Sequence, residues 1–195
     1  MGSRSLGSFH PRGGAGARRG GGSMANLKVL YTAEEIGERI RGIGARIAED
    51  YEGESVVLLG ILKGAAFFLA DLARAIPVPT AFEFVDVTTQ PGERGEVVSL
   101  TYATHFNVTG RHVLILKDVL HSGVTENYLM THLSQQRPAS MEIAALVDKP
   151  GLRSVNLSAR YSVLNDVPEG FLVGYGLGGD PVENINRPDL CLLDS

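Results

Sequence analysis

One segment, His112 to Tyr128 with the sequence HVLILKDVLHSGVTENY, constrains the fold of this chain more than any other. It opens with a short apolar run, His112 to Leu116, whose length and β-branched residues favour a buried strand. The charged pair Lys117 and Asp118 follows the run, and the polar loop His121 to Thr125 comes next. Large apolar side chains then recur at helical spacing at Leu129, Met130 and Leu133. The segment therefore predicts a strand, a tight polar turn and a helix.

The polar turn has two interpretations. A Ser-Gly-x-Thr turn between a strand and a helix directs several backbone N–H groups and the positive end of the helix dipole toward one point, which suits a phosphate group. The same residues also suit an ordinary turn in which Ser122 caps the helix. A motif this short does not separate the two interpretations, so the rest of the chain has to decide between them.

Helices and strands alternate along the rest of the chain. A capping box at Thr32–Glu35 begins an amphipathic helix that ends near Asp50, and Ala65–Ala75 predicts a second helix. Strands are predicted at Ser55–Leu62, Thr80–Thr89, Glu96–Tyr102, Met141–Val147, Ala159–Val163, Phe171–Tyr175 and Leu190–Leu193. Gln90–Gly95 is expected to be an exposed loop. This order predicts an α/β fold with a mainly parallel sheet flanked by helices.

The composition and charge describe one ordinary globular domain. Apolar residues make up 44% of the 195 residues, no apolar run is long enough to span a membrane, and the one cysteine, Cys191, fits a reducing cytoplasm. Residues 1–23 are rich in Gly, Ser and Arg and are predicted to be a disordered tail, inert rather than targeting, before a single domain at 24–195. The tail holds four of the 18 basic residues, which leaves 14 against 22 acids in the body. An acidic body argues against nucleic-acid binding.

Polar residues follow four of the predicted strands, at Lys63-Gly64, Thr88–Gln90, Lys117–Thr125 and Asp148-Lys149. The carboxyl ends of parallel strands meet at one edge of a sheet, where ligands bind. We therefore expect at least three of these segments to converge. Taken singly, Lys63 and Lys149 also suit solvated lysines at ordinary turns.

The segments also resemble one known family. Val113 to Thr125 resembles the phosphoribosyl pyrophosphate motif of type I phosphoribosyltransferases, and nearly the whole chain from Val29 to Leu193 is similar to the hypoxanthine-guanine phosphoribosyltransferases. The matching stretches are GILKGAAFFLADLARAI at 60–76, AALVDKP at 144–150 and FLVGYGL at 171–177. The resemblance implies the type I fold with a small hood and a flexible hairpin or lid.

The resemblance implies these site residues. Leu62, Lys63 and Gly64 would form the pyrophosphate loop, whose backbone in this family often includes a cis peptide. The cradle for the 5′-phosphate would be formed by His121, Ser122, Gly123, Val124 and Thr125. Lys149 would read the 6-oxo group of the purine, Phe171 would stack on its ring, and Leu172 would meet its edge. Asp118, next to Lys117, would hold the ribose hydroxyls and ligate Mg²⁺.

Five positions depart from the family's pattern. Lys117 stands in place of an acid, and His121 replaces the aspartate that accepts a proton beside N7 of the purine; a neutral imidazole can accept a proton too. Gly178 replaces an aspartate that helps to hold Mg²⁺, and Gln90 stands where the family's lid carries Ser-Tyr. The family also has a downstream arginine on the pyrophosphate side; this chain has none in register, although Arg187 lies close by. These changes fall at catalytic, metal and lid positions, whereas the phosphate- and base-binding positions persist.

The resemblance implies purine salvage, by transfer of 5-phosphoribosyl from phosphoribosyl pyrophosphate to hypoxanthine or guanine, giving IMP or GMP and pyrophosphate with Mg²⁺ as cofactor. His121 and Asp118 would carry the chemistry. The departures leave two alternatives open: an impaired relative that binds purine nucleotides as a sensor or partner subunit, and a transferase for another base such as xanthine. By the same resemblance we expect a homodimer or homotetramer.

Overall fold

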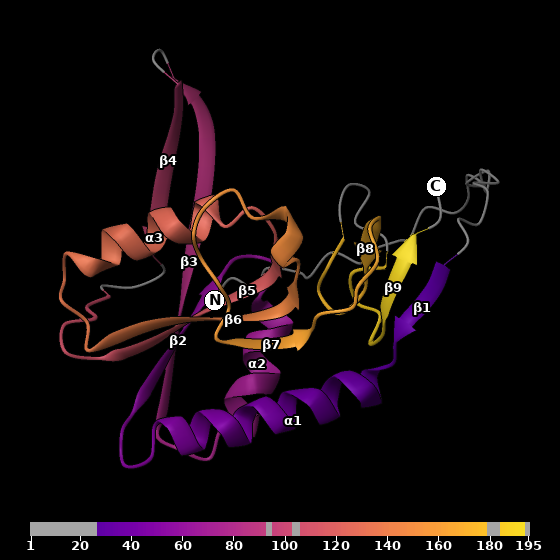
Figure 1. Cartoon of the computed structure of the whole chain (residues 1–195), viewed down its shortest axis with the longest axis horizontal. Helices are drawn as coiled ribbons and strands as arrows, with labels where there is room; N and C mark the ends of the chain where they lie inside the picture. The colour runs from indigo at the N-terminus through magenta and orange to yellow at the C-terminus, as the bar shows by residue number, and fades with distance from the viewer. Residues whose placement is uncertain (1–26, 93–94, 103–105, 179–183, 194–195) are drawn as a thin grey trace, which may run out of the picture.

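The computed structural model of the chain describes residues 27–92, 95–102, 106–178 and 184–193. Its main sheet has six strands in the order β4-β3-β2-β5-β6-β7, all parallel except for β4, which runs antiparallel to β3 (Figure 1). The strands are β2 (Val56–Ile61), β3 (Thr80–Gly92), β4 (Gly95–Tyr102), β5 (His112–Leu120), β6 (Ser140–Asp148) and β7 (Tyr161–Leu164). The predicted α/β fold with a mainly parallel sheet is confirmed.

A second, smaller sheet joins the two ends of the described chain. It consists of β1 (Leu27–Tyr31), β9 (Leu190–Leu193) and β8 (Phe171–Val173), paired antiparallel in that order. Figure 1 shows this sheet beside the main sheet, next to the start of helix α1 (Ala33–Asp50). It corresponds to the hood that the family resemblance implied.

Helices cover both faces of the main sheet. Helices α1 and α2 (Ala66–Ala75) lie on one face, and α3 (Val124–Ser134) lies on the other (Figure 1). Successive residues of a strand point to opposite faces, so Leu58 of β2 packs in the core on the side of α1 and α2, and Leu59 packs in the core on the side of α3. Because both faces are buried, β2 has no exposed residue. A short 3₁₀ helix, Pro150–Leu152, follows β6.

The predicted capping box at the start of α1 is present. The Thr32 side chain accepts a hydrogen bond from Glu35 N at 3.3 Å, and Glu35 Oε2 accepts one from Thr32 N at 2.8 Å. Downstream, α1 and α2 approach closely at Gly44, where a Cβ would lie 2.5 Å from the carbonyl oxygen of Ala75. The helix pair therefore needs a glycine at that position.

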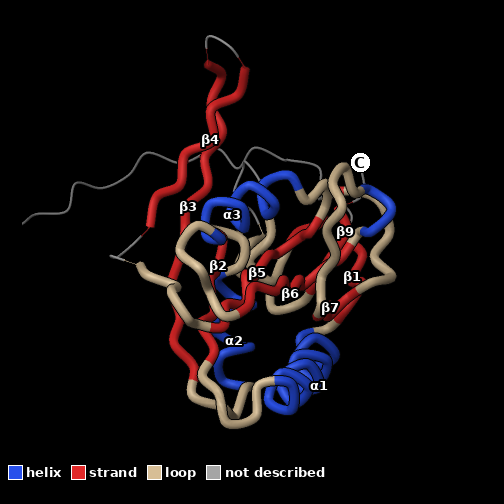
Figure 2. The backbone as a smooth tube through the Cα atoms, turned by 60° about the vertical axis from the view of Figure 1, so that its left-hand side comes forward, coloured by secondary structure: helices blue, strands red, loops and turns tan. Residues whose placement is uncertain are grey.

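The structure corrects several predicted boundaries. β5 continues to Leu120, so Lys117 and Asp118 belong to the strand rather than follow it. Gln90–Gly95 is not a loop throughout, because β3 extends to Gly92 and β4 starts at Gly95 in a hairpin that projects from the body (Figures 1 and 2). Ser122 is not the N-cap residue of α3; that position is held by Gly123, in the left-handed conformation with φ 79°.

Two further predictions lie partly or wholly outside the described residues. The proposed disordered tail at 1–23 is outside them, as are Glu93 and Arg94 between β3 and β4.

Within the described part of the chain, no helix is long and apolar enough to cross a membrane.

Candidate functional site

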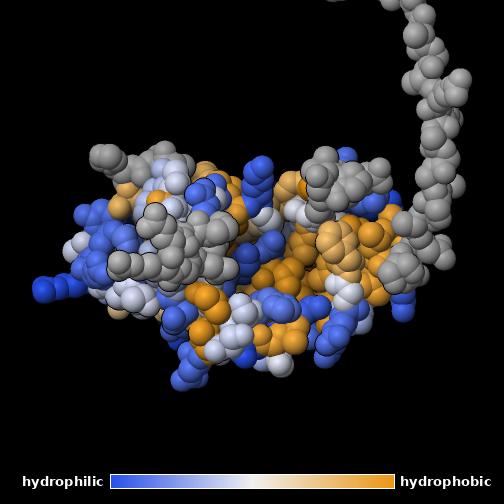
Figure 3. Space-filling model, turned by 90° about the horizontal axis from the view of Figure 1, so that it is seen from above, coloured by the Kyte–Doolittle hydropathy of each residue, from blue (hydrophilic) through white to orange (hydrophobic). Residues whose placement is uncertain are grey.

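A cavity of about 950 Å³ lies where the carboxyl ends of β2, β5 and β6 face the small sheet. Seven of the predicted site residues line it: Lys63, Gly64, Asp118, His121, Lys149, Phe171 and Leu172. Figure 3 looks onto the molecule from above, where hydrophobic residues gather around the hollow between its two halves. The cavity is therefore an apolar space with a small number of charged groups at its rim, which is typical of a site for a flat organic ligand.

The loop after β2 places a cation and a close backbone at the cavity. The Leu62-Lys63 peptide is cis, as the family resemblance implied, and the side chain of Lys63 makes no hydrogen bond or ion pair with any described residue. Gly64 lies against Asp118 so closely that a Cβ on it would come within 1.8 Å of Asp118 Oδ2. Only glycine fits there, and the free ammonium of Lys63 is available for an anion.

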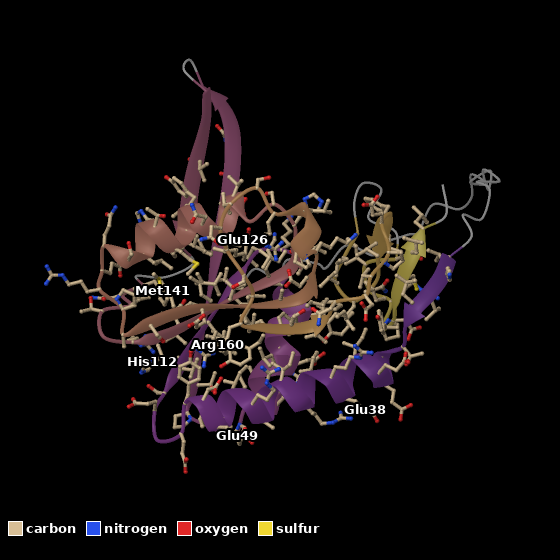
Figure 4. All side chains as sticks on the ribbon, in the orientation of Figure 1. Glu38, Glu49, His112, Glu126, Met141 and Arg160 are labelled. Carbon is tan, nitrogen blue, oxygen red and sulfur yellow. The ribbon has the colours of Figure 1, made fainter. Side chains whose placement is uncertain are left out.

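Asp118 belongs to a three-residue charge cluster. Lys117 Nζ lies 3.0 Å from Asp118 Oδ1 and 3.8 Å from Glu126 Oε1. Glu126 extends from the first turn of α3 and has a side chain only 4% exposed; Figure 4 shows it on the α3 side of the main sheet. Sequence reasoning missed Glu126. The sequence does indicate it, because Glu126 lies three residues before Leu129 and seven before Leu133, and this spacing places the acid on the apolar face of the helix.

His121 lines the cavity, and an arginine fixes the backbone around it. Arg153 Nη1 donates to the carbonyl oxygen of Leu120 at 2.7 Å, to that of His121, and to that of Lys149 at 3.3 Å. Its Nη2 pairs with the carboxylate of Asp148, and its side chain is 11% exposed. Arg153, which sequence reasoning also missed, thus holds the end of β5 against the end of β6.

The other residues of the predicted phosphate cradle lie next to the cavity rather than on its wall. Ser122, Val124 and Thr125 are not among its lining residues, and neither are Gly123, Leu62 and Lys117. The backbone turns here at Gly123. This position favours glycine for two reasons: its φ of 79° is strained for other residues, and an added Cβ would lie 3.0 Å from the side chain of Val155. Ser122 Oγ accepts a hydrogen bond from Val124 N at 3.4 Å. The turn remains at the N-terminus of α3, where the first backbone N–H groups have no carbonyl partner within the helix.

The opposite wall carries the residues predicted to bind the purine. Phe171 is 52% exposed, so one side of its ring is free, whereas Leu172 is buried. Lys149 Nζ donates a hydrogen bond to the carbonyl oxygen of Pro168 at 3.1 Å, which anchors the lysine close to this wall. Glu169 and Leu152 complete the apolar and acidic rim.

Tyr175 attaches the small sheet to the main body. Its hydroxyl donates a hydrogen bond to Asp71 of α2, and burial, followed by this hydrogen bond, raises the pKa of Tyr175 far above its ordinary value. The neighbouring Gly176 lies against the loop after β2, since a Cβ there would be 3.3 Å from the carbonyl oxygen of Gly64. Gly178, where the family resemblance led us to expect a metal-binding aspartate, lines the cavity without offering a side chain.

Arg187 does not line the cavity. Its carbonyl oxygen accepts a hydrogen bond from Tyr175 N at 2.8 Å, and its Nε is buried with no hydrogen-bond partner among the described residues. Gln90 likewise lies away from the cavity, within the pair β3–β4 opposite Val97. The polar segment Thr88–Gln90 thus does not join the three segments that converge.

Comparisons with known proteins agree with this geometry. The phosphoribosyl transferase domain model matches residues 27–177. The chain is 40% identical over 160 residues to the hypoxanthine-guanine phosphoribosyltransferase of Mycobacterium tuberculosis, covering 78% of this chain and 79% of that protein. It is 35% identical over 152 residues to the Staphylococcus aureus protein of the same name, covering 77% and 84%.

Solved structures show the same likeness. A structure of the hypoxanthine phosphoribosyl transferase of Trypanosoma cruzi superposes with a TM-score of 0.78 at 36% identity, covering 88% of this chain and 93% of that one. A hypoxanthine-guanine phosphoribosyltransferase from Bacillus anthracis gives 0.78 at 30% identity, covering 86% and 98%. The chain belongs to the phosphoribosyl transferase family, and within it to the hypoxanthine-guanine phosphoribosyltransferases.

Proposed function

We propose that this protein transfers the 5-phosphoribosyl group from phosphoribosyl pyrophosphate to hypoxanthine or guanine, forming IMP or GMP and releasing pyrophosphate. The observation that carries the proposal is the convergence of Lys63, Asp118, His121, Lys149 and Phe171 on one cavity from four separate segments. Its volume of about 950 Å³ is large enough for a nucleotide and leaving pyrophosphate to lie side by side.

The walls of the cavity and the turn beside it each have a defined part in this reaction. Phe171 stacks on the purine and the Lys149 ammonium donates to its 6-oxo group, so the base is held flat with its reacting nitrogen toward the ribose. The free ammonium of Lys63 binds the pyrophosphate and stabilises the charge that develops on it as the bond to the ribose breaks. The turn at Ser122–Thr125 receives the 5′-phosphate at the start of α3.

His121 is the proposed proton acceptor. When the purine nitrogen bonds to the ribose carbon, the base has to lose a proton, and a neutral imidazole nitrogen can take it. His121 lies on the cavity wall, and Arg153 fixes its backbone from behind. Asp118, on the same wall, is the group that faces the ribose hydroxyls.

Magnesium supplies charge stabilisation to the pyrophosphate in this family's reaction. The described residues contain no cluster of three His, Cys, Asp or Glu side chains that could hold a metal ion. Asp118, the predicted ligand, already has Lys117 at one oxygen and Gly64 at the other. The described residues around Asp118 therefore do not fit a magnesium site held by the protein, and Mg²⁺ beside them would have to arrive on the phosphates of the substrate.

A steady-state assay of pyrophosphate release tests the proposal, with phosphoribosyl pyrophosphate, Mg²⁺ and each of hypoxanthine, guanine and xanthine. We expect release with the first two bases. No release with any base at any Mg²⁺ concentration would contradict the proposal. Activity that appears only in the Lys117→Glu, His121→Asp double variant would instead identify a nucleotide-binding relative that has lost its chemistry.

The cellular compartment and the oligomeric state of the protein are a further part of the proposal. We expect a cytoplasmic homodimer or homotetramer, as the family resemblance implies. Sedimentation of the purified full chain measures the assembly directly.

A further inference from the structure

Lys117 brings a positive charge to the carboxylate that faces the cavity. Its Nζ lies 3.0 Å from Asp118 Oδ1, and the two side chains are each 23% exposed. The second carboxylate oxygen, Oδ2, is covered by Gly64, where a Cβ would come within 1.8 Å of it. Both oxygens of Asp118 therefore have protein atoms beside them, and on one side that atom carries a full positive charge.

Glu126 keeps the ammonium in this position. Its side chain is 4% exposed, and the only ion pair it makes within the described residues is with Lys117 Nζ, at 3.8 Å. A buried carboxylate without a cation is costly, so Glu126 holds Lys117 near the sheet from the side of α3. Asp118 holds it from the side of the cavity, and the lysine is thus fixed between two elements.

The charges around the cavity show what Lys117 changes. Among the described lining residues, Lys63 and Lys149 are basic and Asp118 and Glu169 are acidic, so their formal charges cancel. Lys117 adds one positive charge directly beside Asp118, and Glu126 adds one negative charge at a greater distance from the same ammonium, 3.8 Å against 3.0 Å. A sugar that carries a phosphate and a pyrophosphate therefore meets a carboxylate that is paired with an ammonium, rather than a bare negative charge.

We infer that Lys117 supplies, beside Asp118, the neutralising positive charge that a divalent cation would otherwise bring, so that phosphoribosyl pyrophosphate binds this protein without Mg²⁺. The inference rests on the proposed function and deepens it, because it states how the ribose side of the site is charged. It also means that the free protein has no tight Mg²⁺ site of its own at Asp118.

Calorimetric titration of the full chain with phosphoribosyl pyrophosphate, in EDTA and in excess Mg²⁺, tests the inference. For the native protein the two dissociation constants should agree within roughly threefold. For Lys117→Met the affinity in EDTA should fall by roughly tenfold or more, and Mg²⁺ should restore most of it. Lys28→Met, which removes an exposed lysine of β1, is the matched control and should behave as native.

The single variant leaves Glu126 as a buried charge without a partner, and this alone can prevent folding. Lys117→Met combined with Glu126→Gln removes the same ammonium without leaving that charge, and should show the same dependence on Mg²⁺. A direct titration of Mg²⁺ into Lys117→Glu, without substrate, should show saturable binding, whereas the native protein should show none.

The outcomes separate this inference from the proposed function. If the native protein releases pyrophosphate but binds phosphoribosyl pyrophosphate only with Mg²⁺, the inference is wrong and the proposed function stands. An unchanged affinity in EDTA for the double variant would also overturn it. If the native protein neither binds this substrate nor releases pyrophosphate, both fail together.

Discussion

The two edges of the main sheet use similar charged residues in opposite ways. At the amino edge, Arg160 lies 3.1 Å from Asp50 and 3.4 Å from Glu142, and Tyr161 donates to the same Asp50 at 2.5 Å. His112 pairs there with Ser140 at 2.8 Å. Figure 4 shows Arg160 and His112 on the side of α1. These groups contact one another, and none of them lines the cavity at the carboxyl edge.

At the carboxyl edge the charged groups are only partly paired. Arg153 is occupied with carbonyl oxygens and Asp148, but Lys63 has no side-chain partner among the described residues and Lys149 has only one carbonyl oxygen. Charged residues alone therefore do not identify the binding site. An edge becomes a binding site where buried charges hold the backbone and the remaining charges are left for a ligand.

The largest expected effect comes from removing the buried arginine at the carboxyl edge. Arg153→Met should lower the free energy of unfolding by about 3 kcal/mol, because Asp148 loses its cation and the carbonyl oxygens lose their donor. Urea denaturation measures this loss. Arg160→Met at the amino edge is the control and should cost less, because its side chain is 45% exposed. Equal losses of unfolding free energy in the two variants would show that the charged groups at the two edges do not differ in their contribution to stability.

Replacing a lysine that faces the cavity should affect activity more than stability. Lys149→Met should lower kcat/KM for hypoxanthine by roughly 100-fold, because the oxygen of the purine loses its donor in a desolvated site. Steady-state kinetics measures the change, and Arg160→Met should leave kcat/KM as it is. A fall of less than about threefold would mean that Lys149 does not contact the base.

Removing the aromatic wall should have a moderate effect that is confined to the base. Phe171→Ala should raise the KM for hypoxanthine by about tenfold, since stacking of a base on an aromatic ring contributes roughly 1–3 kcal/mol. The KM for phosphoribosyl pyrophosphate should change little. Phe82→Ala is the matched control, because Phe82 is also exposed, at 59%, and lies on β3 away from the cavity. A similar rise in both variants would point to a general loss of packing.

The smallest effect is expected at the amino edge. The hydrogen bond from Tyr161, followed by that from Arg160, lowers the pKa of Asp50 below its ordinary value. A carboxyl with a lowered pKa in the folded state stabilises the fold above its unfolded pKa of about 4, and this contribution is lost as the pH falls through the folded pKa. The urea midpoint of Asp50→Asn should therefore fall less than that of the native protein as the pH is lowered below about 4. Parallel curves would show that the pair contributes nothing.

Most elements of the fold could be predicted from the sequence, because their signals are local. The capping box at Thr32 and the isoleucine spacing of α1 depend only on neighbouring residues, and both are present in the structure. Strand ends were predicted less well. β5 extends past Leu116 because neighbouring parallel strands supply hydrogen-bond partners to its backbone, for example Ala145 opposite Lys117. That pairing joins segments far apart in the chain.

The candidate site was predicted in part, by resemblance and by position after strands. Lys63, Asp118 and Lys149 follow or end parallel strands, and the structure brings all three to one cavity. Glu126 and Arg153 escaped prediction, since an acid in the first turn of a helix and an arginine after a turn are ordinary features. Their importance comes from burial and from partners on other elements.

Local sequence settles which segments form strands and helices and which residue types stand near the strand ends, because periodicity, capping and turn chemistry depend on neighbouring residues. The tertiary structure alone decided which charges neutralise each other and which face the cavity. Lys117 is shared between Asp118 and Glu126 only because β5 and α3 pack together. The strength of a charge pair depends on distance and burial, and both are properties of the folded chain.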